Sequence, residues 1–278
     1  MIENQFFIDH IIHVALEEDL GSGDLTTDAI MDAELKGNAT LLARERLLLA
    51  GLAVFRRVFK ILSPEIEFKY YFDDGQMVPS DKEICIISGS ISSILKAERT
   101  ALNFLQRMSG IATLVRSYVD KVGMQDVRLL DTRKTAPGLR LLDKYAVRVG
   151  GGFNHRFGLY DGILIKDNHI MVAGSITRAV VLAREKAPHT VKVEVEVEDL
   201  AGVEEAVQAG ADAILLDNMS PEIIRQAIKL VDGRVTTEAS GNITLDNIAE
   251  VARTGVDLIS VGAFTHSVRG VDMSLDLI

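Results

Sequence analysis

The sequence predicts an α/β protein that combines an N-terminal α+β sandwich domain with an incomplete parallel α/β barrel of six or seven strands. Three observations support this fold class. Residues 1–115 mix helix-period segments with strand-like segments, which is typical of an antiparallel sheet with helices packed on it. Residues 116–265 instead repeat a short β-branched run and a helical stretch, a pattern that favours parallel strands with right-handed crossovers. No G-x-G-x-x-G follows these strands, so a barrel is favoured over a dinucleotide-binding sheet.

In the first domain, apolar residues on one helical face predict a helix at the N-terminus, and the turn-rich stretch 21–27 ends it. The expected helices are 5–18, 51–62 and 94–122, and the expected strands lie within 38–51, 66–72 and 83–94. The last residues, 266–278, are too few to build a core of their own. We expect them to return to the first domain and pack on it.

The second domain has a regular rhythm of strand and helix. Its expected strands are 127–134, 161–168, 190–197, 211–218, 234–241 and 256–263, and its expected helices lie near 138–149, 174–187, 198–209, 220–231 and 244–254. Gly210 and Gly255 follow two of these helices, where a left-handed C-cap residue is expected. Six units are fewer than the eight of a complete barrel, so the predicted barrel is incomplete.

The composition excludes several classes of function. With 30 Lys and Arg against 40 Asp and Glu, the 278-residue chain has a net charge of −10 and no basic stripe for nucleic acid. No apolar run approaches the roughly 20 residues of a membrane span, and the N-terminus lacks the features of a signal peptide. The single cysteine, Cys85, lies in an apolar run and has no disulfide partner. These features predict a cytoplasmic protein that binds neither nucleic acid nor a membrane.

One segment departs from the acidic character of the chain. Residues 131–169 hold seven Lys and Arg against four Asp, a net charge of +3. These cations stand beside turn-forming residues, at 137–138 and 150–152, and not on a smooth helical face. Loops of this kind carry function, and a local excess of cations attracts anions. The segment therefore indicates a site for a multiply charged anion.

Reactive groups of α/β barrels collect at the C-terminal ends of the strands. The residues at these ends are Arg133, Lys134, Lys166, Asp167, Asn168, Glu194, Glu196, Asp217, Asn218, Glu238, Ser240, Gly241, Ser260 and Gly262. Strand alternation places Glu194 and Glu196 on the face opposite to the neighbouring valines, which in a barrel is the inner face. Because buried charges need partners, we expect cations and carboxylates to converge there. The alternative is an open sheet with a solvated charged face.

Two strand ends contain glycine, at 238–242 and 260–267, and backbone N–H groups at such late strand-to-helix loops often bind phosphate. We expect Thr244 and Thr265 to be the N-caps of the helices that follow. Glu196 and Asp217 suit Mg²⁺; zinc is disfavoured because the Cys and His residues lack ligand spacing, and no nucleophile arrangement stands out. These residues thus predict the transfer of a group from a phosphorylated donor to an anionic acceptor, but they do not identify the reaction.

Several motifs allow a more specific identification. The chain closely resembles the quinolinate phosphoribosyltransferase family over essentially its full length, in DLGSGDLTTDAI (19–30), ERTALNFLQRMSGIAT (98–113), DTRKTAPGLR (131–140), KYAVRVGGGFNHRFGLYDGILIKDNH (144–169), VEVEVE (193–198), LLDN (215–218), EASG (238–241) and SVGAFTHS (260–267). The resemblance implies the sandwich-plus-barrel fold, Mg²⁺ as the cofactor, and a homodimer whose active sites are shared. It also implies that phosphoribosyl passes from phosphoribosyl pyrophosphate to quinolinate with loss of CO₂, which yields nicotinate mononucleotide.

By matching motifs, the resemblance also assigns roles to residues. Arg99 would reach into the neighbouring subunit's site. Glu196 and Asp217 would hold Mg²⁺ and the ribose-pyrophosphate. The residues that would line the quinolinate pocket or hold the donor are Arg133, Lys134, Thr135, His155, Arg156 and Lys166, and those that would cradle the 5′-phosphate are Ser240, Gly241, Asn242, Gly262, Ala263 and Phe264.

Lys134, His155 and Lys166 are the candidate catalytic residues, and either Lys134 or His155 could protonate the carbanion that decarboxylation leaves. The chain departs from the family at Asn242, where a second glycine is frequent; Asn tolerates left-handed conformations, so a phosphate loop remains feasible. Ala136 and Val149 also differ, without loss of charge. The alternatives are a paralogue of the same fold, either a nicotinate-type or a molybdenum-operon-associated enzyme, and a non-catalytic protein that binds phosphorylated metabolites.

Overall fold

A computed structural model describes residues 5–32 and 34–278, and these form two compact units. Unit 1 contains the described residues up to Arg116 together with 136–151 and 268–278, and unit 2 contains 117–135 and 152–267. Residues 136–151, which the sequence analysis included in the barrel, thus group with unit 1. None of the helices in the described ranges combines the length and the apolar character needed to cross a membrane.

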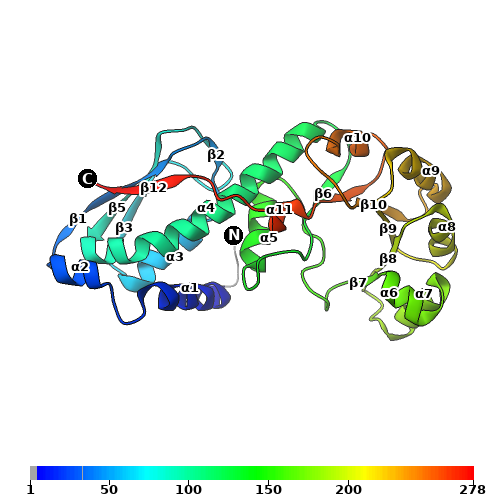
Figure 1. The fold of residues 1–278 in the computed structure, drawn as a ribbon, viewed down its shortest axis with the longest axis horizontal. Helices are drawn as coiled ribbons and strands as arrows, with labels where there is room; N and C mark the ends of the chain where they lie inside the picture. Colours follow the sequence, from blue (N-terminus) through cyan, green and yellow to red (C-terminus); the bar gives the residue numbers. More distant parts are fainter. Residues whose placement is uncertain (1–4, 33) are drawn as a thin grey trace. The chain divides into compact units, whose positions relative to one another are not determined.

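The sheet of unit 1 is antiparallel and has the strand order β12-β1-β5-β3 (Figure 1). Its strands are β1 (Lys36–Ala43), β3 (Glu67–Tyr70), β5 (Lys82–Ser90) and β12 (Met273–Leu277), and a small separate sheet joins β2 (Leu47–Leu48) to β4 (Met77–Val78). Strand β12 pairs with β1 from Ala39–Leu277 to Ala43–Met273. The last strand, β12, therefore forms an edge of the sheet beside the first strand, β1.

The helices of unit 1 bury apolar faces, except the six-residue helix Leu25–Ile30, whose buried residue is Thr27. They are α1 (Gln5–Leu20), α2 (Leu25–Ile30), α3 (Leu52–Leu62), α5 (Arg140–Val149) and α4 (Ile91–Val122), whose residues after Arg116 belong to unit 2. Phe55 and Phe59 of α3 are fully buried and pack with their ring centroids 5.0 Å apart. The free backbone N–H groups at the start of α3 are capped by a residue that is distant in sequence. The Asp74 carboxylate accepts hydrogen bonds from Gly51 N and Leu52 N.

Unit 2 is built around a six-stranded parallel sheet in the order β6-β11-β10-β9-β8-β7. The strands are β6 (Arg128–Leu130), β7 (Ile163–Ile165), β8 (Val193–Val197), β9 (Ala213–Asp217), β10 (Thr236–Ser240) and β11 (Leu258–Ser260). Its helices are α6 (Asp167–Ala173), α7 (Ile176–Lys186), α8 (Leu200–Gln208), α9 (Pro221–Val231), α10 (Ile248–Ala252) and α11 (Ala263–His266). Helices α7 to α10 lie outside the curved sheet (Figure 1). Strands β6 and β7 remain at its edges, so the predicted incomplete barrel is confirmed.

Alternation along β8 positions the charged residues of this sheet. Val193, Val195 and Val197 are buried, whereas Glu194 and Glu196 are only partly buried on the other face. Gly210 and Gly255 have φ values of +79° and +90°, as expected for residues that end helices. The regular part of unit 2 thus follows from its sequence periodicity.

Short elements were missed. The stretch 21–27 does not stay a turn, because α2 begins at Leu25 and the Asp24 side chain accepts hydrogen bonds from Thr26 N and Thr27 N. Helices α6 and α11 were also not expected, since seven and four residues give too few turns for a periodic signal. Neither Thr244 nor Thr265 is an N-cap. Helix α10 begins after Asn247, and Thr265 lies within α11.

Candidate active site

A cavity of about 670 Å³ lies at the C-terminal edge of the parallel sheet, and the ends of all six strands contribute to its wall. The sequence-predicted residues that line it are Arg133, Lys134, His155, Arg156, Lys166, Glu196, Asp217, Ser240, Gly241, Asn242, Gly262 and Ala263. Cations and carboxylates therefore converge on the inner side of the barrel. The alternative of an open sheet with a solvated charged face is wrong.

The first charged pair of the cavity joins β7 to β8. The Lys166 ammonium forms an ion pair with Glu196, and Lys166 N donates a hydrogen bond to His169 Nδ1 at 3.0 Å, at the start of α6. Asp217 ends the neighbouring strand β9. Glu196 and Asp217 thus present carboxylates from adjacent strands, and one of them already carries a cationic partner.

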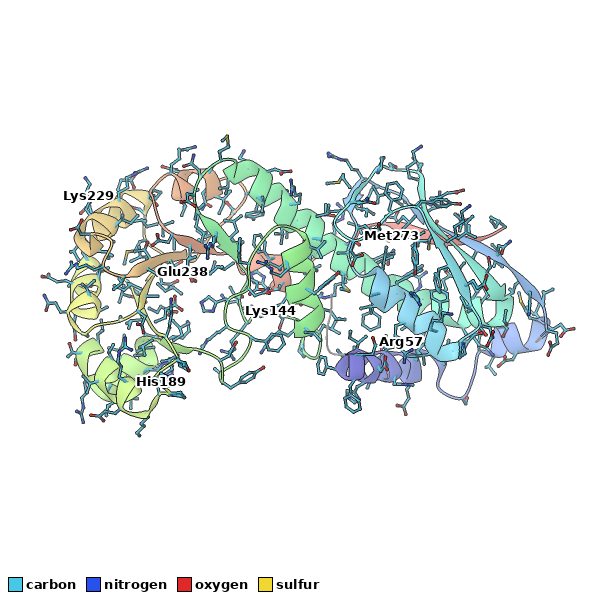
Figure 2. All side chains as sticks on the ribbon, turned by 180° about the vertical axis from the view of Figure 1, so that it is seen from behind. Arg57, Lys144, His189, Lys229, Glu238 and Met273 are labelled. Atoms are coloured by element: carbon cyan, nitrogen blue, oxygen red, sulfur yellow. The ribbon has the colours of Figure 1, made fainter. Side chains whose placement is uncertain are left out.

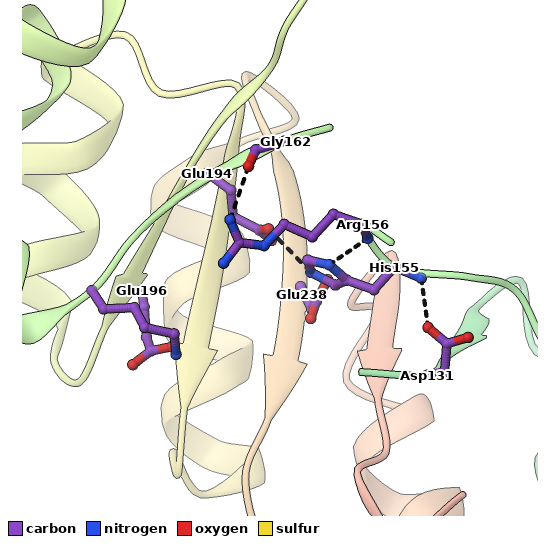
Figure 3. Close-up of polar contacts among 8 residues, drawn as sticks. Asp131, His155, Arg156, Gly162, Glu194, Glu196 and Glu238 are labelled. Atoms are coloured by element: carbon purple, nitrogen blue, oxygen red, sulfur yellow. Dashed lines mark hydrogen bonds and ion pairs between the residues drawn. The ribbon is translucent and has the colours of Figure 1, made fainter. Parts of the chain in front are cut away.

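His155 lies between backbone and carboxylate partners (Figure 3). Arg156 N donates a hydrogen bond to His155 Nδ1 at 2.7 Å, so Nδ1 offers its lone pair and the proton of the neutral ring is on Nε2. His155 Nε2 is 3.2 Å from a Glu194 oxygen and 3.6 Å from a Glu238 oxygen. Both ring nitrogens are therefore engaged by the protein.

Glu238 is the most deeply buried acid of this group. Its side chain is 1% exposed, and Glu238 Oε1 has no hydrogen-bond partner among the described residues. Burial, reinforced by the charge of Glu194, raises the pKa of Glu238 to about 7. Glu238 therefore tends to hold a proton at a pH where most carboxyl groups are ionised.

The loop after β6 fixes the histidine. Asp131 is fully buried, and its carboxylate accepts hydrogen bonds from His155 N at 2.9 Å and from Asn154 Nδ2 at 2.5 Å. Arg156 Nη1 donates to Gly162 O at 2.9 Å (Figure 3). Burial and the nearby charge of Arg133 lower the pKa of Arg156, which remains a cation at neutral pH. Arg133 and Arg156 both line the cavity, and their positive charges repel each other.

The two glycine-containing loops lie at the same edge. Gly241 has a φ of +88° and Asn242 a φ of +53°, which confirms that this Asn adopts the left-handed conformation. A Cβ on Gly262 would lie 3.0 Å from the His266 ring and 3.5 Å from Lys134 Cδ. Thr265 Oγ1 donates to Lys134 O at 2.8 Å. The second loop therefore approaches the backbone and the aliphatic stem of Lys134.

Three of the residues to which the family resemblance assigned roles do not line this cavity, and neither do the strand-end residues Asp167, Asn168 and Glu194. Phe264 is fully buried and packs against Tyr118 with 5.1 Å between ring centroids, because a loop that ends a core strand also needs an apolar anchor. Thr135 is partly buried beside the cavity-lining Lys134. Arg99 belongs to α4 in unit 1, where its side chain is 60% exposed and lies 4.0 Å from Glu98.

The cationic segment 131–169 does not form a single site. Arg140, Lys144 and Arg148 lie on α5 in unit 1 and do not line the cavity. Figure 2 labels Lys144 on α5 and Glu238 on β10. Lys144 is buried, and Asp143 of the same helix forms a bidentate pair with Arg107 at 2.9 and 2.8 Å. Three of the seven cations of this segment therefore lie outside the cavity.

Sequence reasoning missed several residues of the site. Glu194 and Glu238 were recognised as strand-end acids but were given no role, since only the fold shows that both approach His155. The strand-end residues Asn218 and Ser260, which were also given no role, line the cavity, and the further lining residues are Thr132, Leu164, Leu215, Ile243, Thr244 and His266. The alternation of valine and glutamate along β8 places Glu194 on the inner face of the barrel, and this was the sequence feature that indicated it.

Two groups of acids could be considered for a metal ion. His155, Glu194 and Glu238 place their ligand atoms within 4.8 Å of one another, but the proton assigned to His155 Nε2 occupies the lone pair that a metal would need. Glu196 and Asp217 are oxygen donors that line the open cavity, and Mg²⁺ is commonly held by one or two carboxylates and substrate phosphates. Glu196 and Asp217 are therefore suited to Mg²⁺, whereas the group of His155, Glu194 and Glu238 is better suited to hold a proton than a metal ion.

Comparison with known proteins agrees with this geometry. Residues 24–109 match the model of the N-terminal domain of quinolinate phosphoribosyl transferase, and residues 111–276 match that of its C-terminal domain. The chain is 45% identical over 260 residues to a probable nicotinate-nucleotide pyrophosphorylase [carboxylating] of Bacillus subtilis, covering 94% of this chain and 90% of that protein.

Solved structures agree as well. NadC from Streptococcus pyogenes is 47% identical, with a TM-score of 0.94 and 98% of both chains covered. The nicotinate-nucleotide pyrophosphorylase from Francisella tularensis is 42% identical, also with a TM-score of 0.94, and covers 98% of this chain and 96% of that one. Both family domains, in order and over nearly the full length, identify this chain as a member of the quinolinate phosphoribosyl transferase family.

Proposed function

We propose that this protein transfers phosphoribosyl from phosphoribosyl pyrophosphate to the ring nitrogen of quinolinate and releases CO₂, pyrophosphate and nicotinate mononucleotide. The observation that carries the proposal is the cavity at the sheet edge, which combines cations for a dicarboxylate with glycine loops and carboxylates for a phosphorylated sugar. Its relatives include a quinolinate phosphoribosyltransferase [decarboxylating] of Nicotiana tabacum, which is 39% identical over 286 residues.

Quinolinate binding is assigned to the cationic wall. Arg133 and Arg156 both line the cavity, and planar guanidinium groups suit carboxylates because they donate two parallel hydrogen bonds. Burial and the charge of Arg133 lower the pKa of Arg156, and a dianion bound between the two guanidinium groups would relieve their repulsion. Thr135 follows Arg133 and Lys134 in the sequence, and we assign to it the support of this cationic wall.

The phosphorylated donor is assigned to the opposite loops. Ser240, Gly241 and Asn242 together with Gly262, Ala263 and Phe264 would bind the 5′-phosphate, largely through backbone N–H groups. Glu196 and Asp217 would hold Mg²⁺ and the ribose-pyrophosphate. Bound there, Mg²⁺ would neutralise charge on the departing pyrophosphate. Lys166, which is paired with Glu196 in this structure, would help to hold the same anionic group.

The reaction requires a proton after CO₂ leaves. The pyridine nitrogen attacks ribose C1 as pyrophosphate departs; the bond from C2 to its carboxylate then breaks, and its electron pair stays on C2, beside the cationic ring nitrogen. His155 has both ring nitrogens engaged, and Lys166 is paired with Glu196. The Lys134 ammonium lines the cavity and has no side-chain partner among the described residues. We therefore assign protonation of C2 to Lys134, and the orientation of the acceptor wall to His155.

We further propose a cytoplasmic homodimer in which Arg99 completes the site of the neighbouring subunit. Among the described residues, the exposed Arg99 guanidinium has a single charged contact, to Glu98 at 4.0 Å, so it is available to an anion. Sedimentation of the wild type tests the dimer. Mixing inactive Arg99→Ala with inactive Lys134→Ala should restore activity if sites are shared, because each mixed dimer then contains one intact site.

The reaction is tested by incubating the protein with phosphoribosyl pyrophosphate, Mg²⁺ and either quinolinate or nicotinate. We expect equal amounts of CO₂ and nicotinate mononucleotide from quinolinate and little product from nicotinate. Product from nicotinate alone would favour the nicotinate-type paralogue. Tight binding of either substrate with no product would favour a metabolite-binding protein.

A further inference from the structure

Two asparagines at the sheet edge have a backbone conformation that most side chains avoid. Among the described residues, the non-glycine positions with positive φ are Asp81, Asn218, Asp232 and Asn242. Asn218, with a φ of 54°, follows β9, and Asn242, with a φ of 53°, follows β10. Both line the cavity, and the two aspartates do not. Residues in this conformation cluster at functional sites, where the surrounding structure holds them.

The two amide side chains form a relay that starts at Asp217. Asn218 Nδ2 donates a hydrogen bond to Asp217 Oδ2 at 2.7 Å, and Asn242 Nδ2 donates to Asn218 Oδ1 at 2.8 Å. An ionised carboxylate only accepts hydrogen bonds, so Asn218 must turn its amino group to Asp217 and its oxygen to Asn242. The relay therefore has one direction, set by the carboxylate.

The backbone of the loop depends on the same asparagine. Asn218 N donates to Ser240 O at 2.9 Å. Gly241 has a φ of +88°, and a Cβ there would lie 2.2 Å from Asn218 Oδ1, so the Asn218 amide packs directly on the loop. Asn247 Nδ2 donates to Asn242 O at 2.9 Å and ties the loop to the start of α10. One side chain thus contacts the end of β9 and the loop after β10.

The position of this relay argues against a purely structural role. Asn218 and Asn242 are both exposed, and the hydrogen bond between their two neutral amides adds little to the stability of the fold. Yet the relay connects two groups that contact opposite ends of one ligand, if the proposed function is right. These groups are the Asp217 carboxylate, at the ribose-pyrophosphate end, and the 240–242 loop, at the 5′-phosphate end.

We propose that Asn218 and Asn242 form an amide latch, which holds the Asp217 carboxylate and the 240–242 loop at a fixed separation and thereby prepares the site for the phosphorylated donor. The latch rests on the proposed function, and both asparagines are positioning residues. Because the loop is held before the ligand arrives, the donor does not have to order it on binding. In this chain Asn242 thus takes the place of a glycine without loss of the loop conformation.

The test uses Asn218→Gly, Asn242→Gly and the double variant in the full-length protein. Glycine accepts positive φ, so each change removes the amide and keeps the backbone. The dissociation constant of phosphoribosyl pyrophosphate with Mg²⁺, measured by isothermal titration calorimetry, should rise roughly 3- to 10-fold in each single variant, the value of one hydrogen bond. The KM of quinolinate should stay within about 2-fold. Because the amides act in series, the double variant should match Asn218→Gly.

Asp232→Gly is the matched control, because Asp232 also has positive φ, at the end of α9, and does not line the cavity. It should leave donor binding unchanged. Unchanged donor affinity in both single variants, or equal losses for donor and quinolinate, would overturn the latch. A wild type that binds the donor but forms no product would overturn only the proposed reaction, and the calorimetric comparison would still decide the latch. A wild type that does not bind the donor would overturn both.

Discussion

The two ends of the parallel sheet use their charged residues in opposite ways. At the N-terminal end, Asp212 accepts hydrogen bonds from Val193 N at 2.7 Å and from Arg184 at 2.9 Å, and Asp257 accepts from Thr237 N and Thr237 Oγ1, both at 2.8 Å. At the C-terminal end, one oxygen of the buried Glu238 has no hydrogen-bond partner in the part of the chain that the structure describes.

The pKa values follow the same division. Although burial acts in the opposite direction, the hydrogen bonds from Val193 and Arg184 hold the pKa of Asp212 below its usual value. Burial raises the pKa of Glu238 to about 7. Charges that are satisfied at folding stabilise the sheet, whereas charges that are left strained or unsatisfied can interact with a ligand. We infer that the N-terminal end serves stability and the C-terminal end serves the reaction.

The largest effect is expected from a substitution at the C-terminal end of the parallel sheet. Arg156→Ala should lower kcat/KM for quinolinate by roughly 10²–10³-fold, because it removes a charged partner of a carboxylate in a partly buried cavity. Steady-state kinetics with quinolinate varied at saturating donor measure this. Arg148→Ala is the control, since Arg148 belongs to the same cationic segment but lies exposed on α5. Equal losses in the two variants would show that the cationic segment acts as a whole.

The second effect concerns the proton at Glu238. Its pKa in the folded state is raised from 4.5 to about 7, so its contribution to stability is complete below pH 4.5 and is lost as the pH rises to 7. Glu238→Gln should remove this loss, on the order of 1–3 kcal/mol between pH 5 and pH 8. Urea unfolding at both pH values measures it, with the exposed Glu250→Gln as the control. The same pH dependence in Glu238→Gln as in the wild type would refute the raised pKa.

The third and smallest effect is expected from a substitution at the N-terminal end of the parallel sheet. Asp257→Ala leaves Thr237 N, in a buried residue, without its acceptor, and should lower the free energy of unfolding by about 1–2 kcal/mol. The kcat/KM of the folded protein should stay within about 3-fold of the wild type. Thermal unfolding and turnover measured on one preparation check both, and the exposed Asp246→Ala serves as the control. A large loss of turnover without loss of stability would contradict the division between the two ends.

The two ends also differ in how far the sequence predicts them. Alternation in 190–197 predicts the inward face of β8, because a strand with one buried face must repeat every two residues. The aspartates of the N-terminal end follow Gly210 and Gly255 by two residues in each case. This repeat was not recognised, although it is visible in the sequence.

The C-terminal end depends on contacts that the sequence does not encode locally. His155, Glu194 and Glu238 come from a loop and two strands, and their approach follows from the strand order β10-β9-β8. The relay from Asn242 to Asn218 spans two units of the barrel in the same way. Conversely, the charges of Arg140, Lys144 and Arg148 looked like part of the site because their helix was assigned to the barrel. Composition does not show which unit a helix packs on.

Stability and reaction are thus assigned to opposite ends of one sheet. The decisive experiment measures thermal unfolding and nicotinate mononucleotide formation, side by side, in Lys134→Ala and Asp212→Asn. We expect Lys134→Ala to lose at least about 10²-fold in kcat with an unchanged Tm, and Asp212→Asn to lower Tm by a few degrees (about 1 kcal/mol) with kcat nearly unchanged. Full activity in Lys134→Ala, or a catalytically dead Asp212→Asn of normal stability, would contradict this assignment.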